Sequence, residues 1–209
     1  HIITLFPETI EPYLKSSIVG RARAKGLVKI KYYNLRDFTT DKHGKVDDRP
    51  YGGGPGMVVQ IEPIIKAVQS AKIPNKKAAR VILFTPAEKQ FTNAGAKRLA
   101  KNNHLILICG RYEGIDARVK KAFKMDEVSV GPFVLTGGEL PAMFLIDVIS
   151  RQVRGVLGNL DSLEERRISS SEVYTRPEIL KYKGKNHKVP KVLLSGHAAK
   201  IEEWKKKSK

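Results

Sequence analysis

The chain is nearly free of cysteine, because Cys109 is the only one among 209 residues. This excludes a disulfide framework, and a lone cysteine within an apolar run is expected to be a packed core thiol rather than a nucleophile. No apolar run approaches the roughly 20 residues that a membrane span requires. No signal-peptide pattern opens the chain. These absences predict a globular protein of the reducing cytoplasm.

Several common catalytic and cofactor motifs are also missing from the sequence. No Gly-Lys-Ser/Thr follows the glycine-rich segment, so a P-loop is not supported, and neither is a Rossmann-type site, because there is no Gly-x-Gly-x-x-Gly. The absence of Gly-x-Ser-x-Gly argues against a serine hydrolase. The five histidines are scattered, and none stands at ligand spacing from a cysteine or carboxylate. No metal ligands are therefore predicted.

Acidic residues are few: 21 Asp and Glu stand against 39 Lys and Arg, which gives a formal net charge of +18. Such an excess is compatible with an ordinary basic surface or with a polyanionic partner. Residues 172–209 alone carry 11 Lys and Arg against 4 Glu, a net charge of +7. A separate basic segment of this kind favours nucleic acid over a small acidic metabolite as the partner.

Residues 1–157 alternate short apolar runs with helical stretches. This alternation predicts an α/β domain with a mainly parallel sheet covered by helices on both faces. The expected strands are Ile2–Leu5, Val28–Tyr33, Val81–Phe84, Leu105–Cys109 and Val128–Val130. The expected helices are Ile10–Lys25, Ile61–Ser70, Asn93–Lys101, Ile115–Phe123 and Leu140–Arg151.

Two apolar runs end at glycine and are followed by polar loops, which is how buried strands end at a ligand site. One loop is Gly110–Asp116 and the other is Gly131–Pro141, and we expect them to form one pocket. The segment Thr85–Glu88 reads either as a helix capping box or as a third ligand loop. We favour the loop, with the next helix capped by Thr92, because Gly95 would interrupt a longer helix.

The segment Pro50–Met57 contains four glycines and two prolines and cannot be a helix or a central strand. It is either a floppy surface loop or, as we favour, a loop that closely approaches a flat or anionic group. The helix Leu140–Arg151 is apolar on most sides, so it should be buried or lie in an interface. Arg151 could complement the helix dipole or hold a base or phosphate, and spacing alone favours the dipole.

Residues 158–171 lack apolar periodicity and read as a linker. Residues 172–209 form a small basic unit, in which Ser195 or Gly196 is expected to cap a last helix running to Trp204.

Five motifs in order make the sequence specific enough to compare with a family. They are Asp47–Met57, Cys109–Asp116, Thr136–Ala142, Tyr174–Pro177 and Val192–Gly196. Together they closely resemble the bacterial tRNA (guanine-N1) methyltransferases, which act on guanosine 37, next to the anticodon.

The resemblance implies a SPOUT-type α/β domain whose C-terminal part is a trefoil knot that binds S-adenosylmethionine. It also implies an obligate homodimer in which the partner subunit completes each site, activity that depends on Mg²⁺, and tRNA rather than DNA or a membrane as the partner. The domains would be a knotted methyltransferase domain at 1–157, a linker at 158–171 and a small, mostly helical tRNA-binding domain at 172–209.

The family's binding residues carry over by motif. The cofactor site would comprise Leu83, Phe84, Thr85, Pro86, Gly110, Tyr112, Glu113, Gly114, Ser129, Val130, Gly131, Pro132, Phe133, Val134, Leu135, Gly137, Gly138 and Pro141. The tRNA would contact Asp47, Arg49, Tyr51, Gly52, Gly53, Arg151, Arg176 and Ser195.

Methylation of guanine N1 requires removal of the N1 proton, which a carboxylate base and a cation at O6 would both assist. In the family an arginine matching Arg151 is the cation, and a linker aspartate is the base. The matching linker position here is Arg166, so Glu165 beside it is expected to substitute, with Asp161 and Glu164 as alternatives. Glu113 would favour the sulfonium or a metal ion.

Two other functions stay open at this point. One is a knotted methyltransferase with another RNA target, and the other is a tRNA-binding protein that has lost catalysis. The altered linker is the main support for the second.

Overall fold

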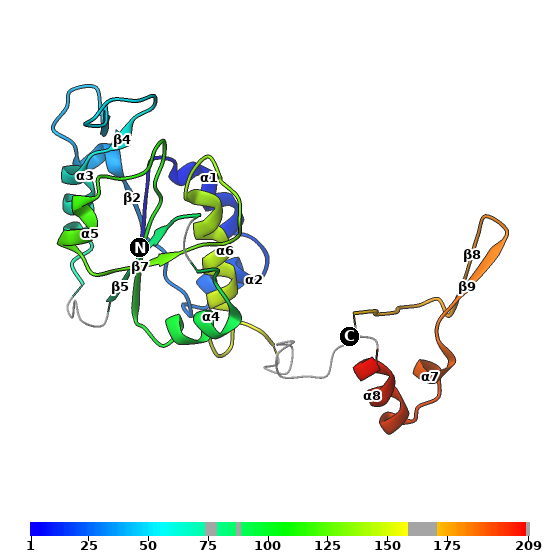
Figure 1. Ribbon diagram of the computed structural model, residues 1–209. Coiled ribbons are helices and arrows are strands. Elements are labelled where there is room, and N and C mark those ends of the chain that lie inside the picture. The colour runs from blue at the N-terminus through cyan, green and yellow to red at the C-terminus, as the bar shows by residue number, and fades with distance from the viewer. Residues whose placement is uncertain (74–78, 87–88, 159–170, 208–209) are drawn as a thin grey trace. The chain divides into compact units, whose positions relative to one another are not determined.

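The computed structural model describes residues 1–73, 79–86, 89–158 and 171–207 (Figure 1). Its contacts divide the chain into two compact units, His1–Leu157 and Gly158–Lys209. Within the described ranges, no helix is both long enough and apolar enough to cross a membrane.

A five-stranded sheet in the order β2-β1-β6-β5-β7 forms the centre of the first unit. Every neighbouring pair in it is parallel, as the alternation of strands and helices predicted. The strands are β1 (Ile2–Thr4), β2 (Tyr32–Asn34), β5 (Ala79–Phe84), β6 (His104–Ile108) and β7 (Met125–Val128).

Helices cover both faces of this sheet. Successive strand residues point to opposite sides, and because both sets are apolar, each face must be buried. Ile2, Ile82 and Leu107 belong to one apolar core, and their neighbours Ile3, Leu83 and Ile108 belong to the other. The first core is shared with α1 (Pro7–Leu14), α2 (Ser17–Ala24), α4 (Asn93–Leu99) and α6 (Glu139–Ser150). The second is shared with η1 (Leu35–Phe38), α3 (Ile61–Ser70) and α5 (Arg118–Ala122) (Figure 1). The predicted covering of both faces is confirmed.

The expected helix Ile10–Lys25 is wrong as a single element, because the chain forms α1 and α2 with a break at Lys15–Ser16. Ser17 has a φ of 50°, outside the helical region. A Cβ on Gly20 would lie 2.2 Å from the carbonyl oxygen of Lys15. The glycine therefore lets the second helix turn tightly against the end of the first.

Two expected strands lie at shifted positions. β2 begins at Tyr32 rather than Val28, because its neighbour β1 offers only three residues for pairing. β7 ends at Val128, where the sequence predicted it to begin. The acidic residues Asp126 and Glu127 concealed this strand, and both are neutralised by ion pairs with Arg80 and Lys120 respectively.

The helix expected at Ile115–Phe123 is shorter, since α5 starts only at Arg118. Ile115 instead forms a parallel bridge with Val59. The capping prediction for α4 is confirmed, because the Thr92 hydroxyl accepts a hydrogen bond from the Gly95 N–H at 3.2 Å.

The second unit contains an antiparallel hairpin of β8 (Ile179–Tyr182) and β9 (Lys185–Lys188), which the sequence did not predict. Two helices follow, α7 (Lys191–Leu194) and α8 (Ala198–Lys207). The last helix thus begins after Gly196 and continues past Trp204. The ring centres of Tyr174 and Trp204 lie 6.2 Å apart, so the segment before the hairpin contacts this helix.

Candidate functional site

A cavity of about 410 Å³ lies where β5, β6 and β7 end, which is the edge at which parallel sheets of α/β proteins hold ligands. The loops that follow these three strands form its walls. Together with the end of β5 and the start of α6, these loops include every residue predicted to bind the cofactor except Pro132. Five further residues line the cavity. Arg111, Ile115 and Thr136 belong to the two loops expected to form the pocket, although they were not predicted as cofactor residues, whereas Lys120 and Val128 lie outside those loops.

The loop after β6 has an unusual backbone. Tyr112 has a φ of 59° and Gly114 a φ of 114°, and the left-handed conformation costs a non-glycine residue roughly 1 kcal/mol or more. Three backbone bonds to a neighbouring segment hold the loop, each at 3.0 Å. The Glu113 N–H donates to Met57, the Val59 N–H donates to Gly114, and the Asp116 N–H donates to Val59. Tyr112 stays half-exposed at the cavity.

The loop after β7 is shaped by Ser129, which is buried at 2% exposure. Its hydroxyl donates to the Gly131 carbonyl at 3.0 Å and accepts from the Gly131 N–H at 3.3 Å. The Phe133 ring lies so close to Gly131 that a Cβ there would be 2.1 Å from it. Phe133 and Val134 are 53% and 83% exposed and form an apolar lip at the cavity.

The loops after β6 and β7 are fastened to each other, although β5 lies between their strands. The Gly138 N–H donates to the Gly110 carbonyl at 2.9 Å. The backbones of Arg111 and Gly137 form an antiparallel β-bridge. A Cβ on Gly138 would be only 2.6 Å from the Cα of Cys109. No side chain fits between these backbones.

Cys109 is a core residue, as predicted, with 1% of its surface exposed. Burial, together with the nearby Glu139 carboxylate, raises the pKa of its thiol well above the ordinary range. The thiol is therefore neutral at physiological pH and unsuited to act as a nucleophile.

The glycine-rich segment is the tip of a short antiparallel ribbon, β3 (Asp47–Asp48) paired with β4 (Val58–Val59). Its glycines at 52, 53, 54 and 56 all have positive φ, between 79° and 108°. Tyr51 is fully exposed. Because β4 also bonds to the loop after β6, the ribbon is anchored beside the cavity.

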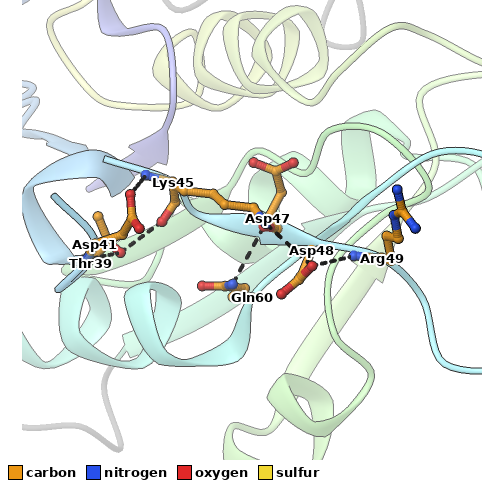
Figure 2. Close-up of polar contacts among 7 residues, drawn as sticks. All are labelled: Thr39, Asp41, Lys45, Asp47, Asp48, Arg49 and Gln60. Atoms are coloured by element: carbon orange, nitrogen blue, oxygen red, sulfur yellow. Dashed lines mark hydrogen bonds and ion pairs between the residues drawn. The ribbon is translucent and has the colours of Figure 1, made fainter. Parts of the chain in front are cut away.

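Figure 2 shows how the base of this ribbon is held. The Asp47 carbonyl accepts from the Gln60 side chain at 3.5 Å, while the Asp47 carboxylate points away from Gln60. Asp48 accepts the Arg49 N–H at 2.8 Å and lies 3.4 Å from Lys45 Nζ. The Arg49 N–H, and next the Lys45 ammonium, lower the pKa of Asp48. The Asp48 carboxylate beside the loop is therefore ionised at neutral pH.

Arg151 does not line the cavity of its own chain. It follows the last residue of α6, a helix of 12 residues and therefore about 18 Å long, whose other end is at the cavity. Glu165, predicted as the base, lies outside the described residues, as do Asp161 and Glu164.

The two remaining residues predicted to contact tRNA are in the second unit. Arg176 is exposed. The Ser195 hydroxyl donates to the Val192 carbonyl at 2.7 Å and accepts from the His197 N–H at 3.2 Å, so it shapes the turn between α7 and α8.

The cavity walls carry three charged side chains, Arg111, Glu113 and Lys120. Lys120 Nζ lies 2.7 Å from Glu127 Oε2. Sequence reasoning missed Lys120 because a lysine on a short helix looks like any solvated residue. Across the part of the chain that the structure describes, no three His, Cys, Asp or Glu residues group so as to hold a metal.

Comparison with known proteins matches the whole chain, residues 1–209, to the family model described as "tRNA (Guanine-1)-methyltransferase TrmD". The chain is 50% identical to the tRNA (guanine-N(1)-)-methyltransferase of Dictyoglomus turgidum, over 99% of this chain and 82% of that protein. It is 48% identical to the protein of the same name from Geobacter metallireducens, over 99% of this chain and 84% of that protein. The chain therefore belongs to the tRNA (guanine-1)-methyltransferase family.

Proposed function

We propose that the protein transfers a methyl group from S-adenosylmethionine to N1 of guanosine 37 in tRNA. The observation that carries this proposal is the gathering of the predicted cofactor residues around one cavity at the end of three parallel strands. Membership of the family supports the reaction and the substrate.

The cavity suits S-adenosylmethionine in size and lining. Its volume of about 410 Å³ falls within the range typical of small-molecule sites. Gly114 lines the cavity and has no atom within 4 Å of an added Cβ, so a ligand can closely approach its backbone. The apolar lip of Phe133 and Val134, together with the neighbouring Leu135, would cover the adenine, and Glu113 would favour the positive sulfonium. The bound cofactor supplies an electrophilic methyl group.

The chain's own residues would supply the acid–base chemistry. Glu165 would accept the N1 proton, and the Arg151 guanidinium would stabilise the negative charge that develops on O6. Loss of that proton makes N1 a nucleophile. The glycine-rich loop would place the guanine near the methyl group, since β4 fastens it to the cavity wall that carries Glu113.

We further propose a homodimer in which each cavity is completed by the second subunit. The position of Arg151, a helix length away from the cavity of its own chain, supports a role in the other site. The outer face of α6 also exposes Leu140 and Phe144, which are 55% and 48% accessible. Exposed apolar side chains one helical turn apart are suited to contact a second copy.

The return of the chain from β7, past β5, to the loop after β6 supports the proposed trefoil knot. In the proposed organisation, residues 1–157 bind the cofactor, residues 158–171 link the two domains and residues 172–209 bind tRNA. The net charge of +7 in residues 172–209 supports this last role. We place the enzyme in the cytoplasm, where tRNA is modified.

Mg²⁺ is proposed as a requirement for activity from the family resemblance alone. The described residues contain no cluster with three or more potential metal ligands, so no catalytic step is assigned to the ion.

The test is transfer of labelled methyl from S-adenosylmethionine to a tRNA transcript with guanosine at position 37, beside the same transcript with adenosine there. We expect label only on the first, recovered as 1-methylguanosine. Label on a ribose or in another RNA would indicate a different methyltransferase. Cofactor binding and salt-sensitive tRNA binding without transfer would indicate a protein that has lost catalysis.

A further inference from the structure

Glu139 is a deeply buried carboxylate that the proposed chemistry does not use. It is the first residue of α6 and is 2% exposed. It does not line the cavity, but the adjacent Gly137 and Gly138 do. A buried carboxylate is costly unless it is paired, so its partners indicate what it does.

Two side chains from distant parts of the sequence meet this carboxylate. The Thr4 hydroxyl, at the end of β1, donates to Oε1 at 2.7 Å and accepts the Phe6 N–H at 3.0 Å. Arg111 Nε lies 3.1 Å from Oε2. The N–H of Arg111 does not point along this line, and neither atom has an aligned hydrogen bond. The contact between Arg111 and Glu139 is therefore mainly electrostatic.

Arg111 carries the effect of Glu139 to the cavity. Its Nη1 donates to the Thr136 carbonyl at 3.3 Å, and its guanidinium lies 4.6 Å from the centre of the Phe6 ring. Arg111 and Thr136 belong to the two fastened loops, and both line the cavity. Arg111 and Glu139 thus lie where the loops after β6 and β7 meet, a place that we call the joint.

The joint has no spare room. A Cβ on Gly137 would lie 2.5 Å from both Arg111 Nε and Glu139 Oε2. Since only glycine leaves space for the pair, the spacing of the two loops and the position of the pair depend on each other.

We propose that Glu139 is a positioning residue for the cofactor. By holding Arg111, it fixes the loop after β6 against the loop after β7, and so sets the width of the cavity between them. The ligand in this inference rests on the proposed function, whereas the coupling between the loops does not. Its loss should weaken cofactor binding more than it slows methyl transfer at saturating cofactor.

The test compares the full chain with Glu139→Gln, which keeps the side-chain shape but removes the charge opposite Arg111. We expect the Kd for S-adenosylmethionine, measured by calorimetry, to rise roughly 10-fold. This is the lower end of the loss in affinity seen at metal sites when a residue that orients a metal ligand is replaced. The kcat at saturating cofactor should stay within about twofold of the wild type. Glu139→Asp, which restores the charge, should recover part of the affinity.

Asp126→Asn is the matched control. It breaks the ion pair between Arg80 and Asp126, in which Arg80 Nε donates to Asp126 Oδ2 at 2.7 Å. Neither residue lines the cavity. The Kd should stay within about twofold of the wild type, since no cavity loop is touched. An equal rise in Kd in this control would mean a general effect of lost stability, and an unchanged Kd in Glu139→Gln would refute the positioning role.

Thr4→Val is the second variant should Glu139→Gln fail to fold. It removes the hydrogen bond to Oε1 without changing a cavity residue, and should raise the Kd in the same direction by a smaller factor. Hydrogen exchange of the Gly138 amide, measured without cofactor, separates the two proposals. Faster exchange in Glu139→Gln supports the joint even if the wild type binds no S-adenosylmethionine, and unchanged exchange overturns it.

Discussion

Gly56 lies directly against the side chain of Glu113: a Cβ on Gly56 would be 2.5 Å from Glu113 Oε1 and 2.7 Å from its Cγ. The two residues belong to the glycine-rich loop and the loop after β6, for which we propose tRNA and cofactor binding respectively. The contact therefore links the two binding functions through one side chain. A substitution in either loop should therefore alter the ligand affinity of the other.

Gly56→Ala should weaken cofactor binding, because the new methyl group would displace Glu113. We expect the Kd for S-adenosylmethionine to rise about 10-fold, equivalent to about 1.4 kcal/mol. Gly54→Ala is the matched control, since Gly54 also has positive φ, 108°, but no atom within 4 Å of an added Cβ. Gly54→Ala therefore introduces only the strain of an alanine at positive φ and displaces no neighbouring side chain. Equal effects of both variants on the Kd would assign the loss to strain and not to Glu113.

Arg151→Ala should lower the rate of methyl transfer by about 10² or more, the order seen when one charge-stabilising donor is lost. Single-turnover kinetics at saturating cofactor and tRNA would measure it. Arg154→Ala removes the same charge from an exposed position three residues later and should leave the rate within about threefold. A near-normal rate for Arg151→Ala would remove that arginine from the chemistry.

Glu165→Gln should slow turnover while leaving the Kd for S-adenosylmethionine unchanged, because the amide cannot accept the N1 proton at neutral pH. The pH–rate profile of the wild type should also lose its acidic limb in the variant. If turnover and profile both persist, the base is elsewhere, and the same substitution at Glu164, or Asp161→Asn, should then reproduce the loss.

Cys109 should make stability fall at alkaline pH. Burial raises the pKa of the folded thiol, so the folded state holds the proton longer than the unfolded state, in which the pKa is about 8.5. The stabilisation is complete below about pH 8.5 and is lost as the pH rises toward the folded value. Urea unfolding at pH 7 and pH 9.5 should show a larger decrease for the wild type than for Cys109→Ala. Equal decreases would contradict this assignment.

The sequence located the walls of the cavity because their signals are local. An apolar run that ends at Gly110 or Gly131 marks the point where a strand stops and a loop begins. The same reasoning failed at β7, where Asp126 and Glu127 look like surface residues until Arg80 and Lys120 are seen beside them. Pairing partners that are distant in sequence cannot be read from a window of neighbours.

The buried charge pair was beyond sequence reasoning for a similar reason. Glu139 reads as an ordinary acidic residue in the first turn of a helix, and its contact with Thr4 spans 135 positions. The break between α1 and α2 depends equally on a close approach, that of Gly20 to Lys15. Propensity and periodicity contain no information on such contacts.

The fastening of the loop after β7 has a consequence for the continuity of the polypeptide. The segment is bonded at one end through Thr85 and Val128 and at the other through Gly110 and Gly138, while Val134 between them is 83% exposed. A single proteolytic cut at Val134 would leave two fragments that these bonds and the surrounding core still join. The protein should thus survive as a nicked, non-covalent complex, whereas an inserted residue at Gly138 would separate the backbones on which that complex depends.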